Sequence, residues 1–403
     1  MTNLVVGSVP RGDDYFGQEL LIQSIWERLK KDNVLLAAPR RFGKTAVMYK
    51  LLDKPLQEFT PVYTNLESIK TAGNFMVELI SIIYQKHQFR HIVKKLWEGG
   101  KGIASFFRNL PEDIDIGGIK VKVRENTDVP DHWLMYGERI MNLLAQEKPA
   151  LLLILDEFAV MIDHISKKDK DEVEQLLRWF RSARTAPDTR TRFVIGGSIH
   201  LLPMLDEMGM VDTVNDLYIQ KLKSFNLETA RLYIMAIFDS QPMECPDKVR
   251  DKIIELVGEP IPYFLAVFLA EIFEHLRATE LKLKPAVVQT VFEEVLMGGP
   301  ASATFYHYRS RIHDYYRGWE EQAAKSILGL LSRADSSIEK QTLYHLFLKS
   351  TNMSHSTQSE EKFMRLMNKL DNDFYITCQE GKYSFYSRVL KLWWKNRYGF
   401  QGE

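Results

Sequence analysis

The sequence predicts an α/β fold with a parallel sheet, followed by a helical region and a C-terminal region with a β-ribbon. Over the first half, apolar strand patterns alternate with helical ones, which implies parallel strands joined by helical crossovers. Beyond about Phe225 the strand signal fades and four helical patterns follow. After residue 300, three helices precede two short strands, which is the element order of a winged helix.

The first half is predicted to begin with a helix over 18–31, where apolar residues recur at helical spacing. A nearly continuous apolar run over 150–155 is typical of a parallel strand buried on both faces. Residues 114–123 alternate around Gly117-Gly118, as a hairpin would. The other predicted strands are 33–38, 61–66 and 192–196, and the other helices are 45–53, 72–88, 133–146 and 172–184.

The second half is predicted to be mainly helical, with a break at Gly298-Gly299-Pro300. The predicted helices are 226–238, 246–257, 262–277, 286–296, 310–331, 338–348, 359–370 and 387–398, and two strands at 374–377 and 382–385 flank Gly381. Because 403 residues are too many for one ordinary core, we expect domains over 1–224, 225–300 and 301–403.

The composition, 45% hydrophobic and 26% charged, is that of a soluble globular protein. Lys+Arg and Asp+Glu both number 53, which does not favour global attraction to nucleic acid or to a membrane. The longest apolar run, 261–273, is shorter than the roughly 18–20 residues of a membrane helix. With two isolated cysteines and no signal-peptide pattern at the N-terminus, we expect a cytoplasmic protein without a membrane segment.

A phosphate-binding loop is predicted between the strand over 33–38 and the helix that follows it. The loop reads Ala38-Pro39-Arg40-Arg41-Phe42-Gly43-Lys44-Thr45. A strand, a glycine-containing loop and a helix in this order expose backbone N–H groups to phosphates at the helix N-terminus. An ordinary strand-to-helix turn would give no reason for two arginines and a lysine beside it.

Residues 39–46, from Pro39 to Ala46, are therefore predicted to bind a nucleoside triphosphate, most simply ATP with Mg²⁺. Lys44 would neutralise the β- and γ-phosphates, and the Thr45 hydroxyl would ligate Mg²⁺. Gly43 permits close backbone approach. The usual pattern opens with Gly where this chain has Ala38, and Ala tolerates positive φ poorly.

Two adjacent acids, Asp156 and Glu157, end the apolar strand over 150–155. Ligands bind at the carboxyl ends of strands in open α/β sheets. Asp156 would hold Mg²⁺ through water, and Glu157 would orient or deprotonate the attacking water, since phosphoryl transfer needs mainly positioning and charge neutralisation. The alternative is that the two acids merely begin the next loop.

Four further groups of residues have weaker assignments. Ser198, after Gly196-Gly197, would be a γ-phosphate sensor or part of a plain turn. Tyr15 or Phe16 would stack on the adenine or anchor the N-terminal arm. Arg41 is the best candidate for an ATP-responsive contact. An arginine finger from a neighbouring subunit would instead imply a nucleotide-dependent homo-oligomer. Five further arginines could supply such a finger or could form a solvated basic face. These are Arg40, Arg178, Arg181, Arg184 and Arg192.

The C-terminal tail interleaves basic and aromatic residues, a pattern that can bind nucleic acid. The residues are Lys382, Arg388, Lys391, Trp393, Trp394, Lys395, Arg397 and Tyr398. The apolar members also fit one helical face packed on the domain. DNA binding through 301–403 and a protein-contact role are both open, because fold alone does not decide between them.

Several of these motifs together resemble the archaeal-type ATPases, prokaryotic members of the STAND branch of AAA+ P-loop NTPases. The motifs are Phe16-Gly17-Gln18-Glu19, the phosphate loop, Leu155-Asp156-Glu157-Phe158, Gly196-Gly197-Ser198 and Ile261-Pro262-Tyr263-Phe264-Leu265. The resemblance spans about residues 7–270. It implies an αβα nucleotide domain, a helical lid and a winged-helix domain, with Pro262 as a lid residue near the adenine.

The resemblance also implies ATP-dependent switching more than fast turnover. We therefore expect a slowly hydrolysing Mg²⁺-ATPase that acts as a molecular switch on an unidentified protein partner. The first alternative is a DNA-associated ATPase of the loader or transposition-helper type, and the second is a non-enzymatic module stabilised by nucleotide. The adjacent acids Asp156 and Glu157 favour hydrolysis over the second alternative.

Overall fold

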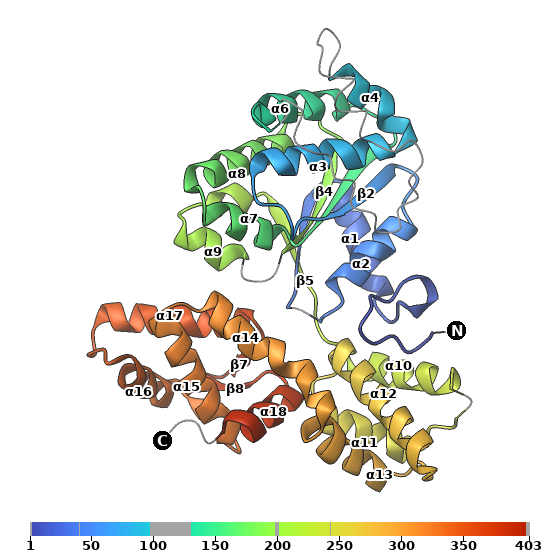
Figure 1. Cartoon of the computed structure of the whole chain (residues 1–403), viewed down its shortest axis with the longest axis vertical. Helices are drawn as coiled ribbons and strands as arrows, with labels where there is room; N and C mark the ends of the chain where they lie inside the picture. Colours follow the sequence, from blue (N-terminus) through green and yellow to red (C-terminus); the bar gives the residue numbers. More distant parts are fainter. Residues whose placement is uncertain (1, 40, 97–129, 198–200, 242, 400–403) are drawn as a thin grey trace. The chain divides into compact units, whose positions relative to one another are not determined.

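The computed structural model describes residues 2–39, 41–96, 130–197, 201–241 and 243–399 (Figure 1). The predicted hairpin over 114–123 lies outside these residues, as do Arg40 and Ser198. The chain divides into two compact units. We call Gln18–Ala38 with Lys44–Leu222 the sheet unit, and Met1–Gly17, Pro39–Gly43 and Lys223–Glu403 the helical unit.

Five parallel strands form the sheet of the sheet unit, in the order β2-β3-β4-β1-β5 (Figure 1). They are β1 (Asn33–Ala37), β2 (Phe59–Asn65), β3 (Ala150–Asp156), β4 (Arg192–Gly197) and β5 (Leu217–Lys221). Every residue of β3 is buried, as its apolar run predicted. The edge strand β5 was not predicted, because only Leu217 of its five residues is buried and no apolar run marks it.

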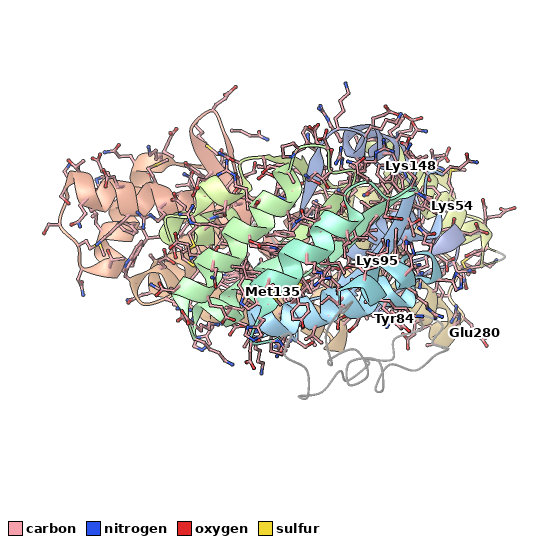
Figure 2. The ribbon with its side chains drawn as sticks, turned by 90° about the horizontal axis from the view of Figure 1, so that it is seen from above. Lys54, Tyr84, Lys95, Met135, Lys148 and Glu280 are labelled. Atoms are coloured by element: carbon pink, nitrogen blue, oxygen red, sulfur yellow. The ribbon has the colours of Figure 1, made fainter. Side chains whose placement is uncertain are left out.

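Helices cover both faces of this sheet. α1 (Glu19–Leu29) and α2 (Lys44–Asp53) lie on one face, and α3 (Ala72–Gln85), α6 (Trp133–Leu144), α7 (Phe158–Ser166) and α8 (Lys170–Thr185) lie on the other (Figure 1). Alternate residues of β3, Leu151, Leu153 and Leu155, join the core with the second group of helices. Figure 2 shows α6, which carries Met135, alongside α3, which carries Tyr84.

Shorter elements complete the sheet unit. They are η2 (His87–Phe89), α4 (Arg90–Lys95), α9 (Leu201–Glu207) and η3 (Val211–Val214). The strands predicted at 33–38, 61–66, 150–155 and 192–196 and the helices predicted around 18–31, 72–88, 133–146 and 172–184 are all present with shifted ends. The predicted parallel α/β sheet is therefore confirmed.

The helical unit begins with η1 (Gly12–Asp14) and continues after residue 223 as a run of helices. Four helices were predicted over 226–296, and the structure has α10 (Leu227–Asp239), α11 (Asp247–Val257), α12 (Pro262–Thr279) and α13 (Pro285–Thr290), the last extended by a π-helical stretch, η4 (Val291–Met297). A short turn, η5 (Pro300–Phe305), follows.

The C-terminal residues of the helical unit form α14 (Tyr306–Tyr315), α15 (Trp319–Arg333), β6 (Ile338–Glu339), α16 (Lys340–Thr351), α17 (Thr357–Asn372), β7 (Ile376–Gln379), β8 (Lys382–Phe385) and α18 (Arg388–Tyr398). The strands pair antiparallel in the order β6-β8-β7. The helices predicted at 338–348, 359–370 and 387–398 and the β-ribbon predicted about Gly381 are present with shifted ends.

One predicted helix, 310–331, is wrong as a single element: it is broken between Tyr315 and Trp319. Gly318 has φ 60°, outside the helical region. Tyr316 is fully buried and its hydroxyl donates to Asp373 at 2.7 Å, so a tertiary contact overrides the local helical pattern. Among the described residues, no helix is both long and apolar enough to cross a membrane.

Candidate nucleotide site

A cluster of polar side chains lies at the carboxyl end of the parallel sheet in the sheet unit. Lys44 is the first residue of α2, and Asp156 is the last residue of β3. Lys44 Nζ lies 3.5 Å from Asp156 Oδ1 and 3.6 Å from Glu157 Oε1. Lys44 is 8% exposed and Asp156 1%, so the charges pair where water screens them little.

Asp156 is held by several donors. The Thr45 hydroxyl donates to its Oδ2 at 2.7 Å, and the backbone N–H of Glu157 donates to its Oδ1 at 2.9 Å. Tyr63, on β2, donates to Oδ2 from its hydroxyl at 3.4 Å. These contacts fix the carboxylate at the strand end, where the sequence predicted an ion-holding acid.

Tyr63 was not predicted from the sequence as part of this cluster. Burial raises its pKa above the usual range of a phenol, and the negative charge of Asp156 raises the pKa further. The phenol therefore keeps its proton and can donate to the carboxylate. The Tyr63 ring also packs against Tyr49 of α2, with 5.0 Å between ring centroids.

Glu157 has a left-handed backbone, with φ 54°, and occupies the N-cap position of α7. Non-glycine residues in this region are uncommon and are concentrated at functional sites. The turn leaves the Glu157 side chain 17% exposed beside the fully buried Asp156. The two adjacent acids thus differ in their access to water. This difference fits the roles predicted from the sequence, in which Asp156 holds Mg²⁺ and Glu157 orients the attacking water.

Gly196, on β4, makes room for Asp156. A Cβ atom at Gly196 would lie 2.6 Å from Asp156 Oδ1 and 2.5 Å from Met48 Cε. Within the motif Gly196-Gly197-Ser198, the sequence predicted a role for Ser198. Among the described residues of this motif, it is Gly196 that lies against Asp156. Nothing in a single sequence distinguishes a glycine of this kind from a turn glycine.

The middle of the phosphate loop, Pro39–Gly43, belongs to the helical unit. Arg41 has φ 73° and Gly43 has φ 83°, whereas Ala38 is not among the residues with positive φ. The departure from Gly at Ala38 therefore places no strained residue at the start of the loop. Successive residues with alternating backbone hand can form an anion-binding concavity of N–H groups.

Side chains of the helical unit hold this loop. The Arg41 guanidinium lies over the Tyr263 ring, 4.4 Å from its centroid. Phe42 is 1% exposed and packs against Phe374 at 5.0 Å and Tyr386 at 6.2 Å between ring centroids. Burying a phenylalanine contributes about 1.5–3 kcal/mol, which outweighs the about 1–2 kcal/mol cost of a left-handed arginine.

Other residues predicted to bind nucleotide are placed as follows. Tyr15 is 7% exposed, and the Phe16 ring packs against Tyr233 of α10 at 5.5 Å. Pro262 is the first residue of α12, and Ala46 is buried in the first turn of α2. The contact of Phe16 with Tyr233 fits the alternative in which these aromatic residues anchor the N-terminal arm. Stacking of Tyr15 or Phe16 on adenine stays a prediction.

Among the competing arginines, Arg184 and Arg192 are structural. Arg184 is 3% exposed and pairs with Asp216 at 2.8 Å, and it donates to the carbonyl of Thr213 at 2.7 Å. Arg192 donates to the carbonyl of Leu29, at the end of α1. Arg178 pairs with Glu174, and both Arg178 and Arg181 lie near Asp212. Their ion pairs fit the solvated face predicted as the alternative.

The two tryptophans of the C-terminal tail are core residues. Trp393 is 0% exposed and Trp394 1%, so they are not available to stack on bases. Lys391 donates to the carbonyl of Ala334, and Arg388 donates to the carbonyl of Glu255 at 2.9 Å. The tryptophans of the tail therefore contribute to helix packing, and DNA binding would depend on the basic residues and the half-buried Tyr398.

The fold has counterparts among solved structures. The Walker-type ATPase PABY2304 of Pyrococcus abyssi aligns with a TM-score of 0.61 at 14% identity, over 96% of this chain and 98% of that chain. The Aeropyrum pernix ORC2 protein, solved as ADPNP–ADP complexes, aligns with a TM-score of 0.56 at 14% identity, over 93% and 90% of the two chains. No protein-family model and no curated protein sequence matches.

The chain thus shares its overall fold with these two proteins, one of which is described as a Walker-type ATPase. The resemblance predicted from the sequence is confirmed at the level of the fold. At 14% identity the comparison assigns no residue. The roles of individual side chains are therefore inferred from the geometry of this chain alone.

Proposed function

We propose that this chain is a Mg²⁺-dependent ATPase of low turnover that acts as a nucleotide-dependent molecular switch, in the manner of STAND proteins. The observation that carries the proposal is the buried cluster at the end of β3. There Lys44 Nζ lies within 3.6 Å of two carboxylates, and Asp156 accepts a hydrogen bond from Thr45. An ordinary strand-to-helix turn has no need for a buried lysine beside two acids.

The residues fit a magnesium ion. Mg²⁺ prefers oxygen ligands and usually keeps several of its waters, so a hydroxyl and a nearby carboxylate suit it. Thr45 Oγ1 and Asp156 Oδ2 are 2.7 Å apart. The Thr45 hydroxyl directs its proton to Asp156 and keeps its lone pairs for the ion, while Asp156 would accept from water on the ion. A bound Mg²⁺ neutralises phosphate charge.

The side chains of this cluster then have distinct roles. Lys44, which the structure pairs with two carboxylates, would turn its charge to the β- and γ-phosphates. Glu157, the more exposed acid, would orient the attacking water and accept its proton. Phe42 and Arg41 belong to the loop that would surround the phosphates, together with Pro39, Arg40 and Gly43.

The switch would use the three domains predicted from the sequence. These are a nucleotide domain over 1–224, a helical lid over 225–300 and a winged-helix domain over 301–403. The three-stranded β6-β8-β7 sheet with α15, α16 and α17 supports the last assignment. Nucleotide would bias an equilibrium between arrangements of these parts, and loss of the γ-phosphate would change the bias.

The direct test is the affinity for ATP, measured with a fluorescent ATP analogue and Mg²⁺ on the wild-type chain and on Lys44→Ala. Losing a charged contact to phosphate should weaken binding about tenfold to a hundredfold. The matched control is Lys54→Ala, because Lys54 is an exposed lysine just beyond the other end of α2 (Figure 2). Equal affinities for wild type and Lys44→Ala would refute the site.

A further inference from the structure

The loop residue Phe42 is buried in aromatic contacts made by two C-terminal segments of the helical unit. Its ring packs on Phe374, just before β7, and on Tyr386, just after β8. Phe374 and Tyr386 also pack on each other, with 4.7 Å between centroids. The three rings form a closed cluster, which we call the aromatic clamp.

Phe374 is held in a conformation that its residue type disfavours. It has φ 58°, and its N–H donates to the carbonyl of Asp371 while the N–H of Tyr375 donates to that of Leu370. These two bonds make the Schellman ending of α17, in which the left-handed position is usually glycine. A bulky side chain there is an outlier, and outliers of this kind are concentrated at functional sites.

The residues flanking Phe374 are fixed by buried hydrogen bonds. The Asp373 carboxylate accepts from the Tyr316 hydroxyl at 2.7 Å and lies 3.7 Å from the Arg311 guanidinium. The Tyr375 hydroxyl donates to the carbonyl of Tyr308 at 2.5 Å. The strained turn is therefore held from both sides, and its ring is presented to Phe42.

Tyr386 is also oriented by a polar contact. Its hydroxyl donates to Glu259 Oε1 at 3.3 Å, and the Ser224 hydroxyl donates to the same carboxylate oxygen. Glu259 directly precedes Pro260, in the segment that leads to α12. The Tyr263 ring that Arg41 covers comes from the first turn of the same helix.

We infer that Phe374 and Tyr386 are positioning residues for the nucleotide site: through Phe42 they hold the phosphate loop in its phosphate-binding form. Left-handed Arg41, followed by Phe42 and left-handed Gly43, gives the alternating backbone that presents N–H groups to an anion. Arg41 disfavours this conformation on its own, so the loop needs outside support. The C-terminal segment of the chain thereby becomes a determinant of nucleotide affinity.

This inference rests on the proposed ATP binding and specifies how it is regulated. If the loop is competent only in the clamped form, then any change that frees the C-terminal segment lowers the competent fraction and weakens apparent affinity in proportion. By the same linkage, bound nucleotide stabilises the clamp. A partner that grips Phe374 or Tyr386 would therefore release nucleotide.

The decisive variant is Phe374→Gly in the full chain. Glycine suits the left-handed turn and removes the ring, so the fold of the turn is kept while the clamp is lost. We expect the dissociation constant for a fluorescent ATP analogue with Mg²⁺ to rise about tenfold, as if a tenth of the loops stayed competent. An unchanged or lower constant would overturn the inference, because the clamp would then be neutral or inhibitory.

Two controls separate the clamp from a general effect on the fold. Glu380→Gly relieves another left-handed residue, with φ 52°, in the exposed turn between β7 and β8, and should bind as wild type. Tyr386→Phe keeps the ring and loses only the hydroxyl that bonds Glu259, so its affinity should fall by less than that of Phe374→Gly. If Glu380→Gly weakened binding as much as Phe374→Gly, the effect would not belong to the clamp.

A double variant shows whether Phe374 acts through Phe42. Phe42→Ala and Phe374→Gly remove opposite sides of one contact. The double variant should therefore weaken ATP binding no more than either single variant does. Additive losses would contradict the inference. Lys44→Ala separates this result from the proposed function: if Lys44→Ala loses ATP and the Phe374 variant keeps it, the ATP site stands and the clamp falls. If wild type binds no ATP, both are wrong.

Discussion

The end of β3 and the loop at Phe42 are stabilised by opposite kinds of contact. At Asp156, charges and hydrogen bonds meet in a buried polar cluster. At Phe42, three aromatic rings pack on one another, and the polar contact is made by the Tyr386 hydroxyl, which donates to Glu259. Polar clusters depend on geometry within a few tenths of an ångström, whereas apolar contacts depend on area and tolerate rearrangement.

The two regions therefore fit different tasks. The polar cluster has the directionality that an ion and a reacting water need. The apolar ring contacts of the aromatic clamp have little directionality and can be broken and re-formed. A loop that switches between two conformations needs contacts of this kind. We expect substitutions in the first to change chemistry and substitutions in the second to change the fraction of competent loops.

Gly196→Ala should weaken Mg²⁺-ATP binding more than Tyr63→Phe does. Its Cβ would overlap Asp156 Oδ1, and one added methyl in a packed site costs about 1–3 kcal/mol. We expect a lower thermal unfolding midpoint together with at least about tenfold weaker Mg²⁺-ATP binding. Both would be measured by scanning fluorimetry with and without Mg²⁺-ATP.

The control for Gly196→Ala is Gly329→Ala. Gly329 is inside α15, and a Cβ there would meet only the end of Arg333 at 4.0 Å. Alanine favours a helix interior over glycine, so this variant should be as stable as wild type or slightly more stable. Normal binding by Gly196→Ala would mean that Asp156 does not need its observed position.

Tyr63→Phe should have a smaller effect. It removes one neutral donor to Asp156 and keeps the ring against Tyr49, so Mg²⁺-ATP affinity should fall about threefold. Because the raised pKa keeps the phenol protonated, this loss should not vary between pH 6 and about pH 9. A binding titration across that range measures it, and a loss that grows with pH would show that Tyr63 ionises instead.

The polar cluster could largely be predicted from the sequence, and the clamp could not. Asp156 ends β3 and Glu157 follows it, while Lys44 and Thr45 begin α2 after β1. Parallel topology brings such positions to one edge of the sheet. Tyr63 and Gly196 lie on β2 and β4, the two strands that flank β3, but their closeness to Asp156 follows from the strand register, which periodicity does not give. Phe42 and Phe374 are more than three hundred residues apart, and no local pattern links them.

The fold divides in a similar way. Strands with continuous apolar runs were found, while β5 and β6 were missed because short edge strands carry few buried residues. The division of one predicted helix into α14 and α15 follows from the buried Tyr316 contact with Asp373, which is tertiary. The tail helix α18 was predicted, and its two tryptophans, Trp393 and Trp394, are buried, as the packing interpretation expects.

The central claim is that this cluster hydrolyses ATP, and phosphate release by Glu157→Gln tests it most directly. The measurement compares wild type and variant with saturating Mg²⁺-ATP, with ATP affinity determined on the same samples. We predict slow release by wild type that stops when Mg²⁺ is chelated, and at least about hundredfold slower release by Glu157→Gln at unchanged affinity. Equal rates for the two proteins would contradict the assignment of Glu157 and of the catalytic cluster.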